Sequence, residues 1–204
     1  MIDPKDIPDS QIILYADDGY DSHVVRLFLA EKKTKYYLSL LDSERPEDLR
    51  QLNPYNTIPV LVHRDFSLYE LNVIFEYLED RYHGHKLLPD TPKQKALQRQ
   101  LAWRIQNDWL KLGRILLTHK DSLNLQQAQI ARQKLSDALV TLSPIFGQTN
   151  YFMSDDFGWC DVLLGAMLYR LDEMQIQLPT HLCRPLIDYQ KRIFERESFL
   201  QTID

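Results

Sequence analysis

The residue types that most often do chemistry are dispersed along this chain. The closest pair of histidines is His83 and His85, separated by one glycine. Two histidines at this spacing could bind a metal, but zinc takes four ligands and no third cysteine or histidine lies near them. The other histidines and the cysteines, which lack CxxC spacing, suggest no constellation: His23, His63, His119, His181, Cys160 and Cys183. We therefore expect no metal site, no disulfide framework and no cofactor.

Tyr20 and Ser22 place two hydroxyl groups after the first apolar run, where a helix is predicted to begin. Backbone N–H groups and the helix dipole at such a position stabilise a thiolate, so a hydroxyl there could assist thiol chemistry. Ser22 is also a good N-cap for a helix over residues 22–33, because its side chain can accept a bond from the first-turn N–H groups. The sequence favours the structural role for Ser22.

The elements that must position these residues differ between the two halves of the chain. In the first half, strand-like apolar runs occur at residues 12–15, 36–41, 58–62 and 66–69. A polar break at residues 64–65 predicts a hairpin between the last two runs. Helical patterns occur at residues 22–33, 46–52 and 70–82. The resulting order βαβαββα predicts a thioredoxin-like domain over residues 1–85.

The second half carries only helical patterns. Two long amphipathic helices are predicted over residues 92–119 and 125–145, because apolar side chains recur at three- and four-residue steps. Residues 162–171 are apolar nearly all round, which is typical of a buried central helix, and residues 182–200 predict one or two closing helices. The fold class is therefore α/β plus all-α.

The boundary between the halves is predicted at residues 83–92, which contain glycine, two prolines and no periodicity. This places a helical bundle at residues 92–204. The chain has 24 Lys and Arg against 29 Asp and Glu, a formal charge of -5, so direct binding to DNA or an anionic membrane has no global electrostatic support. Residues 1–10 lack a signal-peptide layout, and no apolar run reaches the about 18 residues of a membrane span. These features predict a cytoplasmic protein.

Pro59 lies inside an apolar run, where proline is rare because it cannot donate a ladder hydrogen bond. An edge strand would also tolerate it. Together with Asn53-Pro54 upstream and Glu70 heading the next helix, the run resembles the glutathione-binding half of the glutathione transferase family. In that family this proline is cis, and the preceding backbone, here Ile58, pairs with a thiol peptide. The resemblance implies a glutathione transferase fold across the whole chain.

Further blocks resemble the stringent starvation protein A family, whose members are glutathione transferase-like and associate with RNA polymerase. They occur in both halves, at residues 20–23, 29–32, 104–109, 144–148, 151–155 and 192–200. No single block is decisive, but their order and spacing are hard to obtain by chance. The resemblance implies a homodimeric, non-enzymatic transcription regulator. Such a protein would bind polymerase holoenzyme with its main sigma factor during starvation or acid stress.

The glutathione chemistry of the wider family is missing at two positions. Gly19 stands where related transferases have cysteine or serine, and Leu71 follows Glu70 where the family has serine. Leucine cannot donate to a ligand carboxylate, which removes a charge-assisted hydrogen bond worth roughly 1.5 to 3 kcal/mol. We expect no catalytic residue and a vestigial cleft formed by Gly19, Tyr20, Ile58, Pro59, Glu70 and Leu71. A glutathione-dependent transferase or isomerase using Tyr20 or Ser22 is the alternative.

The stringent starvation protein A family carries a surface Pro-His-Pro motif in the loop joining its domains and uses that surface to contact polymerase. The matching place here holds His83, Gly84, His85 and Lys86, and we expect these residues to form part of the polymerase contact. Gly84 predicts a flexible loop that proline could pre-organise. A solvated linker with two incidental histidines is the alternative.

The sequence also differs from the family's pattern at the start of the apolar helix. Gly158 replaces the serine or threonine of the family's capping box, and Asp161 follows three residues later. Glycine is an acceptable N-cap, and Asp161 can still accept bonds from the backbone. We expect both residues to serve the fold, with Cys160 in the core.

Overall fold

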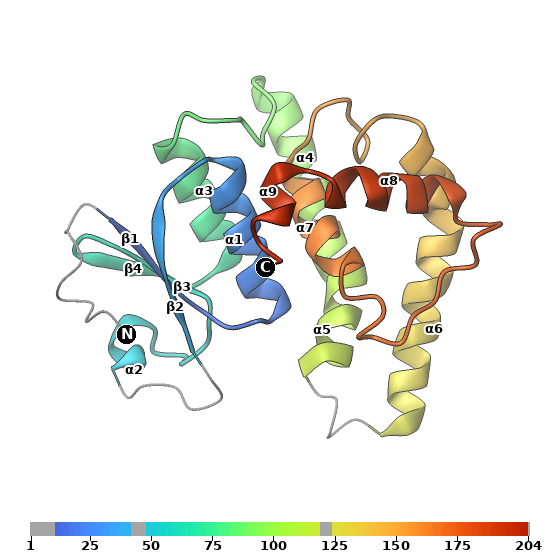
Figure 1. The fold of residues 1–204 in the computed structure, drawn as a ribbon, viewed down its shortest axis with the longest axis horizontal. Coiled ribbons are helices and arrows are strands. Elements are labelled where there is room, and N and C mark those ends of the chain that lie inside the picture. The colour runs from blue at the N-terminus through green and yellow to red at the C-terminus, as the bar shows by residue number, and fades with distance from the viewer. Residues whose placement is uncertain (1–10, 42–47, 119–123, 204) are drawn as a thin grey trace. The chain divides into compact units, whose positions relative to one another are not determined.

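The structure is a computed structural model that describes residues 11–41, 48–118 and 124–203. The chain divides into two compact units, Met1–His85 and Lys86–Asp204 (Figure 1). Within the described ranges, no helix is both long enough and apolar enough to cross a membrane.

The first unit is built on a four-stranded sheet with the strand order β2-β1-β3-β4. Strand β1 (Ile12–Ala16) runs parallel to β2 (Tyr36–Leu40) and antiparallel to β3 (Val60–His63). Strand β4 (Phe66–Leu68) forms the predicted hairpin with β3. The third strand begins two residues later than predicted, because Pro59 has no N–H to donate to the ladder.

Three helices complete this unit: α1 (Tyr20–Glu31), α2 (Leu49–Leu52) and α3 (Leu71–Arg81). Helices α1 and α3 pack together beside the sheet (Figure 1). The rings of Phe28 and Phe75 meet edge-on, with their centroids 4.9 Å apart. The helix predicted from Pro46 begins at Leu49 within the described residues, and Pro46 itself lies outside them. The order of elements is βαβαββα, which confirms the thioredoxin-like half.

The second unit is helical throughout its regular elements. They are α4 (Pro92–Ile105), η2 (Gln106–Leu110), α5 (Lys111–Thr118), α6 (Leu125–Leu142), η3 (Ser143–Gly147), α7 (Trp159–Leu168), α8 (Arg184–Phe194) and α9 (Glu197–Leu200). The buried helix α7 begins and ends three residues earlier than predicted. Its side chains are buried along its whole length, as the apolar pattern indicated.

Two predicted helices of this unit change type before they end. The helix predicted over residues 92–119 contains the π-helical turn η2, where the side-chain amide of Asn107 donates to the carbonyl of Trp103 at 2.8 Å. His119 lies outside the described residues. Helix α6 ends at Leu142, and the 3-10 turn η3 replaces the predicted continuation because Pro144 cannot donate an α-helical bond.

Candidate functional site

The strand pairings bring the residues predicted to form a vestigial glutathione cleft to one end of the sheet. Tyr15 pairs with Val60, so the turn after β1 and the Ile58–Pro59 peptide lie at the same end. Leu68 pairs with Leu61, so the start of α3 follows there as well. The Ile58–Pro59 bond is cis, as the resemblance implied.

The turn after β1 is closed by hydrogen bonds between Asp17 and Ser22. One carboxylate oxygen of Asp17, Oδ1, accepts from the N–H of Gly19 at 2.9 Å and from the hydroxyl of Ser22 at 2.6 Å. The N–H of Asp17 donates to Oγ of Ser22 at 3.1 Å. Ser22 is 1% exposed. Its hydroxyl is therefore held inside the turn and is not presented to a ligand.

The prediction that Ser22 is the N-cap of α1 is wrong. The helix begins at Tyr20 with Gly19 as its N-cap, and Ser22 lies in the first turn. The hydrogen bonds between Asp17 and Ser22 close the turn after β1, so the helix begins at Tyr20, two residues before Ser22. A Cβ atom added at Gly19 would lie 2.8 Å from Oδ1 of Asp17, which is itself fixed by two bonds. A cysteine or serine at this position would have to displace that carboxylate.

Glu70 and Leu71 are the second part of the predicted vestigial cleft. Oε2 of Glu70 accepts from the N–H groups of Asn72 at 2.9 Å and Val73 at 3.1 Å, so this carboxylate caps its own helix. Leu71 is buried and brings no polar group to the surface. Glutathione binding at this point would have to compete with the cap.

Two polar residues support this end of the sheet through side-chain contacts that the sequence did not predict. Asp17 forms the turn that Asp17-Asp18-Gly19 indicates after the first strand, and its carboxylate accepts from the N–H of Gly19. Asn53 is fully buried, and its amide donates to the carbonyl of Thr57 at 2.7 Å. That bond holds the loop that leads to Pro59.

The interaction loop, defined as His83, Gly84, His85 and Lys86, is exposed at all four residues. The ammonium of Lys86 contacts the carboxylate of Asp90 and holds the pKa of that carboxyl below its usual value. Among the described residues, no group of three or more His, Cys, Asp and Glu could hold a metal ion.

Gly84 serves a close approach between backbone segments. A Cβ atom at this position would lie 2.9 Å from the carbonyl oxygen of Lys32, and no glycine in the described residues has a positive φ. The expectation that proline at position 84 would pre-organise the loop is therefore wrong, because its ring would press on that carbonyl.

In the second unit, Asp161 is a buried acid that accepts three hydrogen bonds. Its Oδ1 accepts from the N–H of Phe152 at 2.8 Å and from the hydroxyl of Tyr189 at 2.7 Å, and Oδ2 accepts from the N–H of Gly158 at 2.8 Å. Burial raises the pKa of Asp161 to about 6. Burial also raises the pKa of the Cys160 thiol. The structural role expected for all three positions, 158, 160 and 161, is confirmed.

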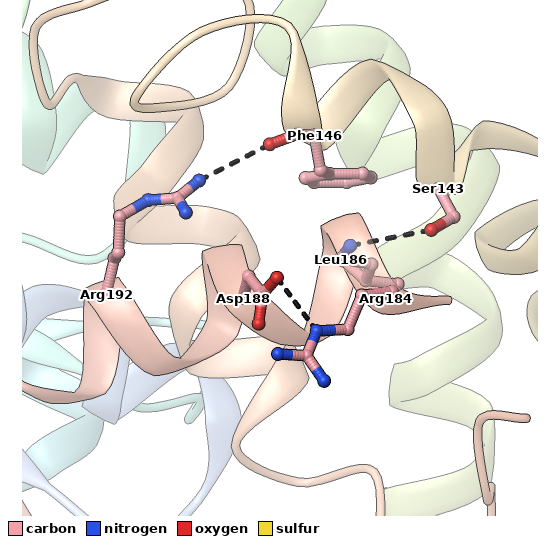
Figure 2. A network of polar contacts seen from close by, with 6 residues as sticks. All are labelled: Ser143, Phe146, Arg184, Leu186, Asp188 and Arg192. Atoms are coloured by element: carbon pink, nitrogen blue, oxygen red, sulfur yellow. Dashed lines mark hydrogen bonds and ion pairs between the residues drawn. The ribbon is translucent and has the colours of Figure 1, made fainter. Parts of the chain in front are cut away.

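Two of the sequence blocks of the second unit, residues 144–148 and 192–200, meet in space. Figure 2 shows Arg192 reaching the carbonyl of Phe146, at 3.4 Å, and the N–H of Leu186 donating to Oγ of Ser143, also at 3.4 Å. Arg192 also donates through Nε to the carbonyl of Asn150 at 3.0 Å. Arginine contacts of this kind hold η3 and the following loop against α8, so these blocks support the fold.

Known proteins that resemble this chain define its fold class. Residues 22–81 match the glutathione S-transferase N-terminal domain family. A glutathione S-transferase from Methylobacillus flagellatus, solved with glutathione bound, has a TM-score of 0.83 at 22% identity, with 94% of this chain and 98% of that chain covered. The chain therefore has the glutathione transferase fold.

The sequence comparison then gives the family. A stringent starvation protein A homolog from Coxiella burnetii is 38% identical over 179 residues, which is 87% of this chain and 84% of the relative. The chain belongs to the stringent starvation protein A family. A probable glutathione S-transferase from Nicotiana tabacum is 27% identical over 186 residues, with 88% of this chain and 82% of the relative covered.

Proposed function

We propose that this chain is a non-enzymatic transcription regulator that acts in the cytoplasm as a homodimer. Its partner is RNA polymerase holoenzyme with the main sigma factor, under starvation or acid stress. Family membership supports the partner. The observation that carries the non-enzymatic role is the closed turn at Gly19, where Asp17 occupies the space of the missing catalytic side chain.

The interaction loop is the proposed polymerase contact. Its four residues are exposed, and no regular element includes them. The exposed ion pair of Lys86 with Asp90 contributes little to stability, because solvent screens it. Loss of these side chains would therefore leave the fold intact while removing a surface that a partner can bind.

The alternative function is a glutathione-dependent transferase or isomerase that uses Tyr20 or Ser22. The similarity to a probable glutathione S-transferase keeps this alternative open. Both hydroxyl-bearing residues are buried, at 6% and 1% exposure, and the Ser22 hydroxyl already donates to Asp17. These contacts favour the regulatory function.

We expect the purified protein to show no measurable conjugation of glutathione to a standard electrophile and no glutathione affinity at the millimolar level or better. The buried Leu71 and the occupied carboxylate of Glu70 remove the anchoring bonds. One lost charge-assisted bond weakens affinity by roughly one to two decades. Calorimetry and a conjugation assay measure both quantities, and micromolar binding would contradict the proposal.

Replacing His83, His85 and Lys86 together by alanine should weaken capture of polymerase holoenzyme by on the order of 1 to 3 kcal/mol, as interface truncations do. The melting temperature and the dimer mass from light scattering should stay nearly unchanged, because exposed side chains contribute little to the fold.

The matched control replaces Gln126, Gln127 and Gln129 by alanine, since these side chains are exposed on α6. This control should capture holoenzyme as the parent does. Equal capture by the loop variant and the parent would place the docking surface elsewhere. A monomeric mass of the parent at micromolar concentration would contradict the homodimer.

A further inference from the structure

A surface pocket of about 560 Å³ lies beside the interaction loop in the first unit. The turn after α1 forms one side of this pocket, which we call the basic pocket, and the segment after α3 forms the second side. Gln11 and Ile12, at the start of β1, also line it. The first side includes Lys33, Thr34 and Lys35, and the second includes Tyr82, His83 and Gly84. The proposed polymerase contact therefore shares His83 and Gly84 with the pocket.

Gly84 explains how the two sides come together. The space that a side chain at this position would fill lies 2.9 Å from the carbonyl oxygen of Lys32. Only glycine permits the segment after α3 to lie this close to the turn after α1. The close approach is what places His83 beside the lysines.

The charge of the basic pocket is not neutralised from within. Lys32 is buried, and its ammonium lies 2.5 Å from the carboxylate of Glu79. Lys33 and Lys35 are exposed, and no carboxylate of the described residues forms an ion pair with either. The pocket is thus locally positive on a chain whose formal charge is -5.

Lys33 also occupies a backbone position that favours glycine. Its φ is 51°, and its N–H donates to the carbonyl of Ala30 at 2.9 Å while the N–H of Thr34 donates to Leu29 at 3.0 Å. This is the Schellman ending of a helix, where glycine is the usual residue because side chains are disfavoured in the left-handed region. Gln175 has the same conformation, with φ 58°, but lies outside the basic pocket. A lysine at this position adds positive charge to the pocket but does not stabilise the left-handed backbone conformation.

We propose that the basic pocket binds an acidic segment of a protein partner, with Lys33 and Lys35 pairing to its Asp or Glu carboxylates. The identity of the partner rests on the proposed function, which would place the acidic segment on polymerase holoenzyme. Complementary charge between exposed surfaces steers association and fixes the docked orientation. A nucleic acid fits less well, because its affinity grows with the number of phosphates neutralised and the pocket offers two exposed lysines, Lys33 and Lys35.

The first test uses a peptide of ten glutamates as the probe, at low salt. The parent should bind it, with NMR shift changes at residues 33–35 and 82–84, and the double variant Lys33→Gly with Lys35→Gln should bind on the order of tenfold more weakly. Raising the salt should reduce this difference, since screening weakens exposed charge pairs. Equal binding by the parent and the double variant would overturn the proposal.

Two single variants separate charge from backbone effects. Lys33→Gly should melt no lower than the parent but bind the peptide more weakly, because it removes a charge and relieves the left-handed side chain. Gln175→Gly is the matched control and should melt no lower than the parent with unchanged binding. A loss of binding in Gln175→Gly would show that glycine at a left-handed position is enough to weaken binding, and would overturn the assignment to the Lys33 charge.

The second test repeats the comparison with polymerase holoenzyme. Reduced capture of holoenzyme by the double variant would support the pocket as part of the docking surface. Capture equal to that of the parent would show that the pocket is not part of it. If the parent captures no holoenzyme but binds the peptide through the lysines, the proposed function fails and the basic pocket stands. Lysine-dependent binding of a DNA duplex with no binding of the peptide would overturn the assignment to an acidic protein segment.

Discussion

Replacing Asp161 by alanine should lower the free energy of unfolding by about 3 to 5 kcal/mol, because three buried donors lose their acceptor together. The donors are the N–H groups of Phe152 and Gly158 and the hydroxyl of Tyr189. Asp161 is 1% exposed and Tyr189 is fully buried, so water cannot replace the lost bonds. The bonds join the start of α7 to α8 and to the preceding loop, so their loss should destabilise the whole second unit.

Urea denaturation followed by circular dichroism measures this effect. Asp156→Ala is the matched control, because Asp156 is an exposed acid in the same segment, and surface substitutions usually change stability by no more than about 0.5 kcal/mol. A loss of less than 1 kcal/mol in Asp161→Ala would show that these bonds do not hold the unit together. If the alanine variant does not fold, Asp161→Asn serves instead, since its carbonyl can still accept from Phe152 and Tyr189.

Asp161 should also give the folded protein a pH dependence. Burial raises its pKa from 3.8 to about 6, so the folded chain binds this proton more tightly than the unfolded chain does. The stability from this group is present below about pH 4 and is lost as the pH rises through 6. At 1.36 kcal/mol per pKa unit, the loss is on the order of 3 kcal/mol.

The Asn variant isolates this contribution, because its amide does not titrate in this range. From pH 4 to pH 7, the difference in unfolding free energy between parent and Asp161→Asn should shift in favour of the variant by on the order of 3 kcal/mol. A difference that stays constant across this range would show that Asp161 keeps an ordinary pKa.

The sequence was sufficient to predict most of the fold and the structural role of Asp161. Strand-like runs and helical spacing reflect local burial, so the order βαβαββα and the helical second half were found correctly. Asp161 was recognised because its partner Gly158 lies one helical turn away. Its bond to Tyr189 joins distant parts of the chain, and no local pattern indicates such a contact.

The first turn shows where local rules compete with each other. Ser22 heads an apolar helical run and is a favoured capping residue, so the sequence predicted a helix beginning there. The structure instead uses the Ser22 hydroxyl to bond Asp17, and Gly19 becomes the N-cap. In either arrangement the Ser22 hydroxyl forms a hydrogen bond. The geometry of the turn after β1 decides which bond it forms.

The basic pocket could not be predicted for a related reason. Gly84 was interpreted as a flexible residue because glycine has wide conformational freedom. Its structural role is to approach the carbonyl of Lys32, a residue far away in the sequence. Only the folded chain shows that Lys33 and His83 line one surface.

Replacing Lys32 by methionine should lower the free energy of unfolding by about 3 kcal/mol, at the low end of the cost of breaking a buried ion pair. The Lys32 ammonium lies 2.5 Å from Oε2 of Glu79, and the two side chains are 1% and 10% exposed. Removing the lysine leaves the carboxylate of Glu79 with little solvent and without this cation. The pair joins the end of α1 to α3, so its loss should also loosen the contact between these helices.

The reverse variant, Glu79→Met, should cost a similar amount, because it leaves the ammonium of Lys32 buried without its carboxylate. The double variant with methionine at both positions should cost less than the sum of the two singles, since it buries no unpaired charge. Urea denaturation of all four proteins gives the coupling free energy, which we expect to be at least about 1 kcal/mol for residues in direct contact. Lys35→Gln is the exposed control and should unfold within about 0.5 kcal/mol of the parent. Additive losses in the double variant would show that each side chain acts through packing alone and that the ion pair does not stabilise the first unit.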